Sequence, residues 1–176
     1  MGMEEMVQNS TPEAWIVVDR GLVRDALLAD KVVYLKGSHP ALREGAWVLV
    51  LNPGGGIVRV GHVMRIRVDA EGSSLYFDKV RTVEPAVGIG STGLLPPTTG
   101  SIVRAPWTDF AEAIPRALGF TLSDIPLIED EAYVRELLQY AIMDDLLGPA
   151  GGPEELIVDM SVRDRYLVGK LAPMEN

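Results

Sequence analysis

Cysteine is absent from this chain of 176 residues, and histidine occurs only twice, as His39 and His62. The lack of cysteine excludes a disulfide framework, a thiolate zinc site and a thiol nucleophile. With two imidazoles and no thiol, a transition-metal site would have to depend on carboxylates. We therefore expect a functional site that contains no metal and no cofactor.

Long apolar runs are also missing from the sequence. No stretch approaches the roughly 20 consecutive apolar residues that a membrane-spanning helix needs. Residues 1–11 are polar and acidic, and they lack the basic start and the apolar centre of a secretory signal. The sequence therefore predicts a cytoplasmic protein with no membrane association.

Positive charge is scarce overall but is unevenly placed. The net charge is −9, and residues 121–176 carry 4 Lys and Arg against 12 Asp and Glu. Residues 31–81 reverse the balance, with 8 Lys and Arg against 4 Asp and Glu. The local excess permits contact with nucleic acid, although ordinary outward-facing strand residues would explain it equally well.

Signatures of catalysis are missing too. No GxSxG motif is present, and two histidines leave serine-hydrolase chemistry little room. Residues 88–93 match the GxGxxG pattern, but Leu94-Leu95-Pro96-Pro97 follows and does not open the helix that dinucleotide binding requires. The adjacent carboxylates Asp144-Asp145 and Glu154-Glu155 point in different directions on a helix, as solvated residues do. We expect a protein that is not an enzyme.

Short runs of β-branched and aromatic residues fill the first half of the chain, separated by turn sequences. The predicted strands are 15–19, 32–35, 47–51, 57–68 and 75–83. Residues 52–56 and 69–74 are predicted hairpin turns, and Glu84-Pro85 is predicted to end the last strand. Such short strands indicate a small closed barrel, because closure removes exposed sheet edges.

Helical spacing of apolar residues predicts helices at 22–29, 107–118 and 129–147, with Pro115 interrupting the second. Residues 88–106 are rich in glycine and proline and are predicted to form a long irregular loop. The expected fold class is α+β, a small barrel with flanking helices and an acidic helical C-terminal tail. The predicted organisation is a disordered leader (1–12), a barrel (13–120), a helical closing segment (121–148), and a linker and tail (149–176).

The order of these elements resembles the PUA-like superfamily, specifically its EVE and ASCH types, over residues 13–145. The resemblance lies in an opening strand with tryptophan (Trp15-Ile16-Val17), a short helix, and a glycine-containing step into a strong strand (Glu44 to Val50). A Val-Gly-x-Val strand (Val60 to Val63), a late strand (Leu75 to Val80) and a closing segment (Ile125 to Ile128) follow. Ala46 stands where the family typically has an aspartate.

The resemblance implies a module that binds RNA or a modified base flipped out of DNA. The residues that it places at the pocket are Trp15, Ser38, His39, Asn52 and Trp107. Lys36, Arg43, Arg59 and Arg65, in the locally basic segment, are the predicted phosphate contacts. A bland alternative remains for these residues: a hairpin turn for Asn52, a solvated turn histidine for His39, and core packing for the tryptophans.

The C-terminal segments 144–155 and 161–173 resemble a region near the N-terminus of DISARM-type anti-phage helicases. No GKS or GKT sequence is present, so helicase activity does not reside in this chain. The leading hypothesis is a nucleic-acid-binding module linked to phage defence or DNA processing, with a helicase or other defence protein as partner. The alternative is a protein-interaction or scaffolding domain that docks through its acidic C-terminal helix.

Overall fold

The computed structural model describes residues 11–146, and the chain divides into two compact units, residues 1–128 and 129–176. The predicted linker and tail (149–176) and all but the end of the predicted leader (1–12) lie outside the described residues. No helix within residues 11–146 is both long enough and apolar enough to cross a bilayer.

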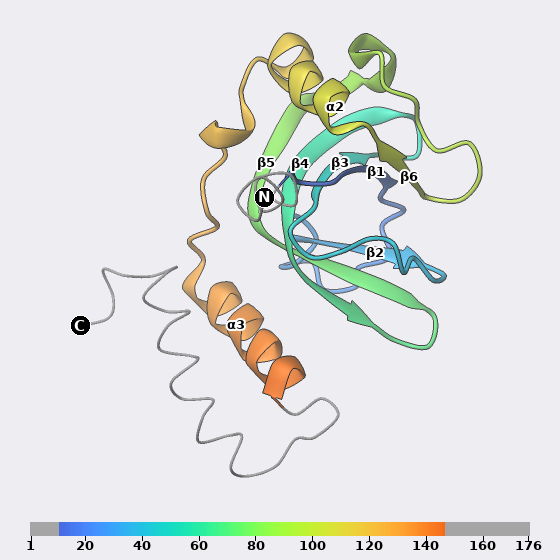
Figure 1. Cartoon of the computed structure of the whole chain (residues 1–176). Helices are drawn as coiled ribbons and strands as arrows, with labels where there is room; N and C mark the ends of the chain where they lie inside the picture. Colours follow the sequence, from blue (N-terminus) through green and yellow to red (C-terminus); the bar gives the residue numbers. More distant parts are fainter. Residues whose placement is uncertain (1–10, 147–176) are drawn as a thin grey trace, which may run out of the picture. The chain divides into compact units, whose positions relative to one another are not determined.

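The first unit is built on one mixed sheet (Figure 1). Its strands are β1 (Ala14–Val18), β2 (Val32–Lys36), β3 (Trp47–Leu51), β4 (Gly56–Val68), β5 (Gly72–Gly88) and β6 (Ile102–Ala105). They lie in the order β2-β5-β4-β3-β1-β6. The β1–β3 pair is parallel and the other neighbouring pairs are antiparallel. The predicted α+β class and the barrel-like character of the sheet are confirmed.

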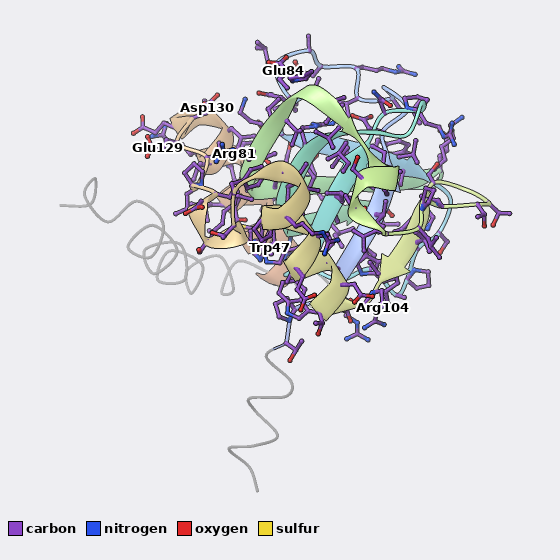
Figure 2. The ribbon with its side chains drawn as sticks, turned by 90° about the horizontal axis from the view of Figure 1, so that it is seen from above. Trp47, Arg81, Glu84, Arg104, Glu129 and Asp130 are labelled. Carbon is purple, nitrogen blue, oxygen red and sulfur yellow. The ribbon has the colours of Figure 1, made fainter. Side chains whose placement is uncertain are left out.

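The expected closure of the barrel is wrong, because the sheet is an open, curled half-barrel. Strands β2 and β6 end the sheet, and no pairing between described residues joins them. Register shifts between β4 and β5 near Arg59 and Val63 accompany the curl of these two long strands. The exposed edges are short, at 5 and 4 residues, and β6 carries the exposed Arg104 (Figure 2). Short, charged edges resist unwanted pairing without closure.

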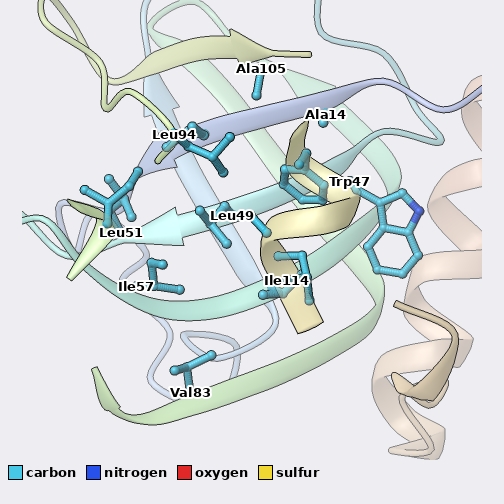
Figure 3. Close-up of a cluster of buried hydrophobic side chains, with 14 of the residues drawn as sticks. Ala14, Trp47, Leu49, Leu51, Ile57, Val83, Leu94, Ala105 and Ile114 are labelled. Atoms are coloured by element: carbon cyan, nitrogen blue, oxygen red, sulfur yellow. The ribbon is translucent and has the colours of Figure 1, made fainter. Parts of the chain in front are cut away.

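Strands β1 and β3 are buried on both faces, which explains why their sequences are almost continuously apolar. On one face Leu49 and Leu51 pack with Ile114, as Figure 3 shows. On the opposite face Val48 and Val50 pack against side chains of β2 and β5. These central strands therefore hold two hydrophobic clusters together and fix the position of every other element of the unit.

Short helical elements cover one face of the sheet. Helix α2 (Trp107–Ala113) continues into a π-helical turn, η2 (Ile114–Leu118), which ends at Gly119 in the left-handed region (φ 86°). The predicted helix at 107–118 is confirmed, as is its interruption at Pro115. Two 3-10 turns, η1 (Ile89–Thr92) and η3 (Leu122–Asp124), complete the unit. The second unit contains α3 (Glu131–Leu146), close to the predicted 129–147.

Three local predictions are wrong. Residues 22–25 are irregular and residues 26–29 form a turn, so the predicted helix at 22–29 is absent. Strand β5 continues past Pro85 to Gly88. Residues 83–86 lie between the Arg59–Thr82 and Ile57–Val87 pairs, so the N–H that proline lacks is not needed for a hydrogen bond between β4 and β5. The predicted loop at 88–106 contains η1 and the edge strand β6, which pairs with β1. Short strands of this kind depend on a distant partner, which a local pattern does not reveal.

The approach of β2 to β5 at Gly72 gives a direct test of the fold. A Cβ atom added at Gly72 would lie 2.1 Å from the carbonyl oxygen of Leu35 and 2.8 Å from the Tyr34 hydroxyl. We expect Gly72→Ala to lower the free energy of unfolding by about 1–3 kcal/mol, measured by urea denaturation. Gly90→Ala is the control, because nothing lies within 4 Å of that position and its effect should stay within about 0.5 kcal/mol. Equal effects of the two changes would contradict this packing.

Candidate cavity at the β4–β5 turn

A cavity of about 770 Å³ lies between the segment that follows β2 and the turn that joins β4 to β5. Its volume is within the range of about 300–1,000 Å³ typical of small-ligand sites. The residues that line it are Gly37, Ser38, His39, Pro40, Leu42, Arg43, Glu44, Ile66, Val68, Asp69, Ala70, Glu71, Gly72 and Ser73. One wall is therefore residues 37–44, and the other is the end of β4 with the turn.

Backbone hydrogen bonds hold the first wall in place. The N–H of Gly37 donates to the carbonyl of Glu71 (2.8 Å), continuing the β2–β5 ladder into the turn. Gly37 adopts the left-handed region (φ 88°), where the chain turns away from β2. The Nε2–H of His39 donates to the carbonyl of Lys36 (2.8 Å), so Nδ1 is the ring nitrogen left to accept a hydrogen bond.

Asp69 organises the opposite wall. Its Oδ1 accepts hydrogen bonds from the N–H groups of Glu71 and Gly72 (both 2.8 Å) and from the Tyr34 hydroxyl (3.0 Å). These donors lower the pKa of the Asp69 carboxyl, the backbone N–H of Glu71 most of all. The pKa of Tyr34 is raised, first by desolvation and then by its hydrogen bond to Asp69. The turn therefore carries a fixed negative charge at neutral pH.

The cavity has charges of both signs, and they differ in whether they already have partners. Glu44 forms an ion pair with Arg65 (3.1 Å) and also accepts from the N–H of Ile66 (3.3 Å). Arg43 lines the cavity and Lys36 immediately precedes it. Both side chains are exposed, and neither forms a hydrogen bond or ion pair with any residue in 11–146. Lys36 and Arg43 are thus the cations available to a ligand.

Four of the predicted site residues come together here. Ser38, His39 and Arg43 line the cavity, and Lys36 is the residue of β2 paired with Gly72 of its opposite wall. The resemblance implied Ser38 and His39, and the local positive charge predicted Lys36 and Arg43. Neither identified the opposite wall, because Asp69 and Glu71 read as an ordinary hairpin turn.

The other three predicted ligand-binding residues lie elsewhere. Asn52 follows β3 at the opposite end of β4, where its Oδ1 accepts from the N–H of Gly56 (2.9 Å) and stabilises the hairpin. Trp15 is 8% exposed and belongs to the core beneath β1. Trp107 stacks on Phe110 with ring centroids 5.9 Å apart. None of these three residues lines the cavity: Asn52 stabilises a hairpin, and the two tryptophans pack against other side chains.

Two of the predicted phosphate contacts are engaged inside the protein. The buried Arg59 forms an ion pair with Asp19 and donates to the carbonyl of Ala29 (2.7 Å). Arg65 is also buried and is paired with Glu44. The alternating sequence of β4 predicted that these side chains face solvent. Residues of the loop 19–31 cover Arg59, and Glu44 covers Arg65. Both arginines hold the fold together instead of facing solvent.

A histidine–carboxylate pair lies outside the cavity and was not predicted. The Nδ1 of His62 is 2.7 Å from Oδ1 of the buried Asp78, and its ring lies 4.9 Å from that of Trp47. Asp78 orients the imidazole as a carboxylate orients a catalytic base. Within the described residues no hydroxyl hydrogen bonds to the other ring nitrogen of His62, so the arrangement holds the base without the nucleophile.

No group of three or more His, Asp or Glu side chains in residues 11–146 is arranged to hold a metal ion. No protein-family model matches the chain, and no curated protein matches it at a significant level of similarity. The class of protein is therefore defined by its fold, an α+β half-barrel, and the mixed-charge cavity described above is the basis for a proposed function.

The internal role of Arg59 leads to a stability prediction. Replacing Arg59 by Met keeps the stem of the side chain but leaves the Asp19 carboxylate without its partner. We expect a loss of about 3 kcal/mol in the free energy of unfolding, measured in urea. Arg104→Met is the control: its ion pair with Glu13 is longer (3.6 Å) and more exposed, so its loss should be below about 1 kcal/mol. Similar losses for both would show that Arg59 is not a structural residue.

Asp69 leads to a prediction about pH. Because its pKa is lowered on folding, its contribution to stability is full above the pKa of the unfolded chain and is lost as the pH falls through the folded value. We expect Asp69→Asn to be less stable than the wild type at pH 7, with the difference shrinking as the pH falls below the usual pKa of an aspartate. Urea midpoints across this range measure it, with the exposed Glu84→Gln as control. A difference that does not change with pH would contradict it.

Proposed function

We propose that the first unit is a nucleic-acid-binding module that receives an unpaired or flipped base in the cavity at the β4–β5 turn. One observation carries the proposal: Ser38 and His39, two of the residues expected at a base pocket, and Arg43, one of the expected phosphate contacts, line the same cavity of ligand size. The cavity has hydrogen-bonding groups on both walls, with the exposed Arg43 in its lining and the exposed Lys36 beside it, a combination that suits a nucleotide.

Each part of a nucleotide has a matching surface. Lys36 and Arg43, exposed and without partners among the described residues, are suited to phosphate. Ile66 and Val68 on the β4 wall, with Leu42 on the other wall, supply apolar surface for the flat face of a base. Val68 is 76% exposed, so its side chain is accessible to a ligand. The Ser38 hydroxyl and His39 Nδ1 supply hydrogen bonds to base edges.

The finer assignment to the PUA-like superfamily is part of this proposal. The curled mixed sheet supports it, with its buried opening strand β1 and the strong central strand β3. We also propose that the protein binds its ligand without transforming it, and that it works beside a helicase or another defence protein. The segments that resemble such helicases, 144–155 and 161–173, lie almost wholly outside the described residues.

The test is binding to labelled single- and double-stranded DNA and RNA, with and without modified bases, over a range of salt. We expect the double variant Lys36→Ala/Arg43→Ala to bind at least tenfold more weakly. The slope of log K against log salt should fall by about 0.7–0.9 for each phosphate group that the variant no longer neutralises.

The matched control is Arg20→Ala/Arg24→Ala, which removes the same charge from an exposed loop outside the cavity. It should leave affinity and salt dependence close to those of the wild type. Failure of the wild-type chain to bind any of these nucleic acids at about 100 μM would overturn the proposed function, since non-specific binding usually reaches that range. Equal weakening by both double variants would show that general charge, and not the cavity, is responsible.

A further inference from the structure

Three carboxylates line the cavity, and two of them already accept hydrogen bonds from other residues of the protein. Glu44 is engaged by Arg65 and by the N–H of Ile66. Asp69 accepts three hydrogen bonds from Tyr34, Glu71 and Gly72, which close the turn on which it lies. Both carboxylates therefore already hold part of the cavity wall in place, through Oδ1 of Asp69 and through the ion pair of Glu44.

Glu71 is different. Its side chain is exposed on the cavity wall, and it forms no hydrogen bond or ion pair with any residue in 11–146. Its backbone, however, is fixed from both sides. The N–H donates to Asp69 (2.8 Å) and the carbonyl accepts from the N–H of Gly37 (2.8 Å). The Glu71 carboxylate therefore lines the cavity without a partner among the described residues, while hydrogen bonds hold its backbone in place. The exposed cations Lys36 and Arg43, which also have no partners there, belong to the facing segment.

An ionised carboxylate accepts hydrogen bonds and donates none. Opposite it, a base that carries an exocyclic amino group places a donor, as the N4 amino group of cytosine and the N6 amino group of adenine do. Uracil and thymine place a carbonyl oxygen at the equivalent position, which repels a carboxylate. The same group that attracts one kind of base therefore excludes the other.

We propose that Glu71 makes the cavity selective for bases with an exocyclic amino group over uracil and thymine. This inference rests on the proposed function, because it assigns the specificity of the same cavity. Lys36 and Arg43 hold the phosphate whatever the base, and Glu71 reads the base edge. Ser38 and His39 on the facing wall position the ring for that contact.

The experiment compares oligothymidylates that carry one cytosine, one adenine or one uracil at the centre, bound to the full chain. Cytosine and uracil are a close pair, because they differ only in the amino or carbonyl group at C4 and in the protonation of N3. We expect the cytosine and adenine probes to bind about tenfold more tightly than the uracil probe, the size expected of one charge-assisted hydrogen bond. Glu71→Gln should abolish this preference with little change in salt dependence, because the amide has the same shape but no charge.

Glu84→Gln is the matched control, since Glu84 is an exposed carboxylate on β5 outside the cavity (Figure 2), and it should keep the preference. Equal binding of the three probes by the wild type, still weakened by Lys36→Ala/Arg43→Ala, would overturn the role of Glu71 and leave the proposed function standing. A preference for the cytosine and adenine probes that survives in Glu71→Gln would likewise overturn the role of Glu71 and leave the proposed function standing. Absence of binding to every probe would overturn both proposals.

Discussion

The pairing of β2 with the start of β5 is the interaction on which the cavity depends. At Gly72 the two backbones approach so closely that no side chain fits between Leu35 and the strand. The same pairing continues into the turn through the hydrogen bond from Gly37 to Glu71. Because both walls are attached to this one ladder, the position of Ser38 and His39 relative to Asp69 and Glu71 is set by backbone hydrogen bonds rather than by flexible side chains.

Burial of the central strands on both faces decides which residues remain for function. With β1 and β3 covered on either side, Trp15 becomes part of the core, and its ring is not available to stack on a base. Burial also separates the cations of the locally basic segment. Arg59 and Arg65 are inside and are neutralised by carboxylates, since an unpaired buried charge is costly, while Lys36 and Arg43 stay in solvent. The effective positive surface is therefore smaller than the number of basic residues in the sequence suggests.

A cavity with charges of both signs suits a ligand that itself has two faces. A uniformly basic surface attracts any polyanion, and its selectivity is correspondingly low. Here the open cations lie on the segment after β2, and the acidic turn lies opposite. A nucleotide matches this division, since its phosphate is anionic and the amino groups of its base are donors. In the proposed function, the acidic wall would lower general affinity for nucleic acid and would give the site a means of discrimination.

The features determined by the sequence alone are those decided by near neighbours. The run Trp47–Leu51 forms a strand, residues 52–55 turn it back, Pro115 interrupts a helix, and the 3.6-residue spacing after Glu129 gives α3. The family resemblance pointed to Ser38 and His39 on one wall of the cavity, and the local charge pointed to Lys36 and Arg43. Tertiary structure decided the rest. Pairings between segments distant in the sequence produce the open curl of the sheet and the strand at 102–105. Such pairings also bury Arg59 and bring Ser38 and Glu71 into the lining of the same cavity. A local pattern states which side chains alternate, but long-range pairing decides what covers each face.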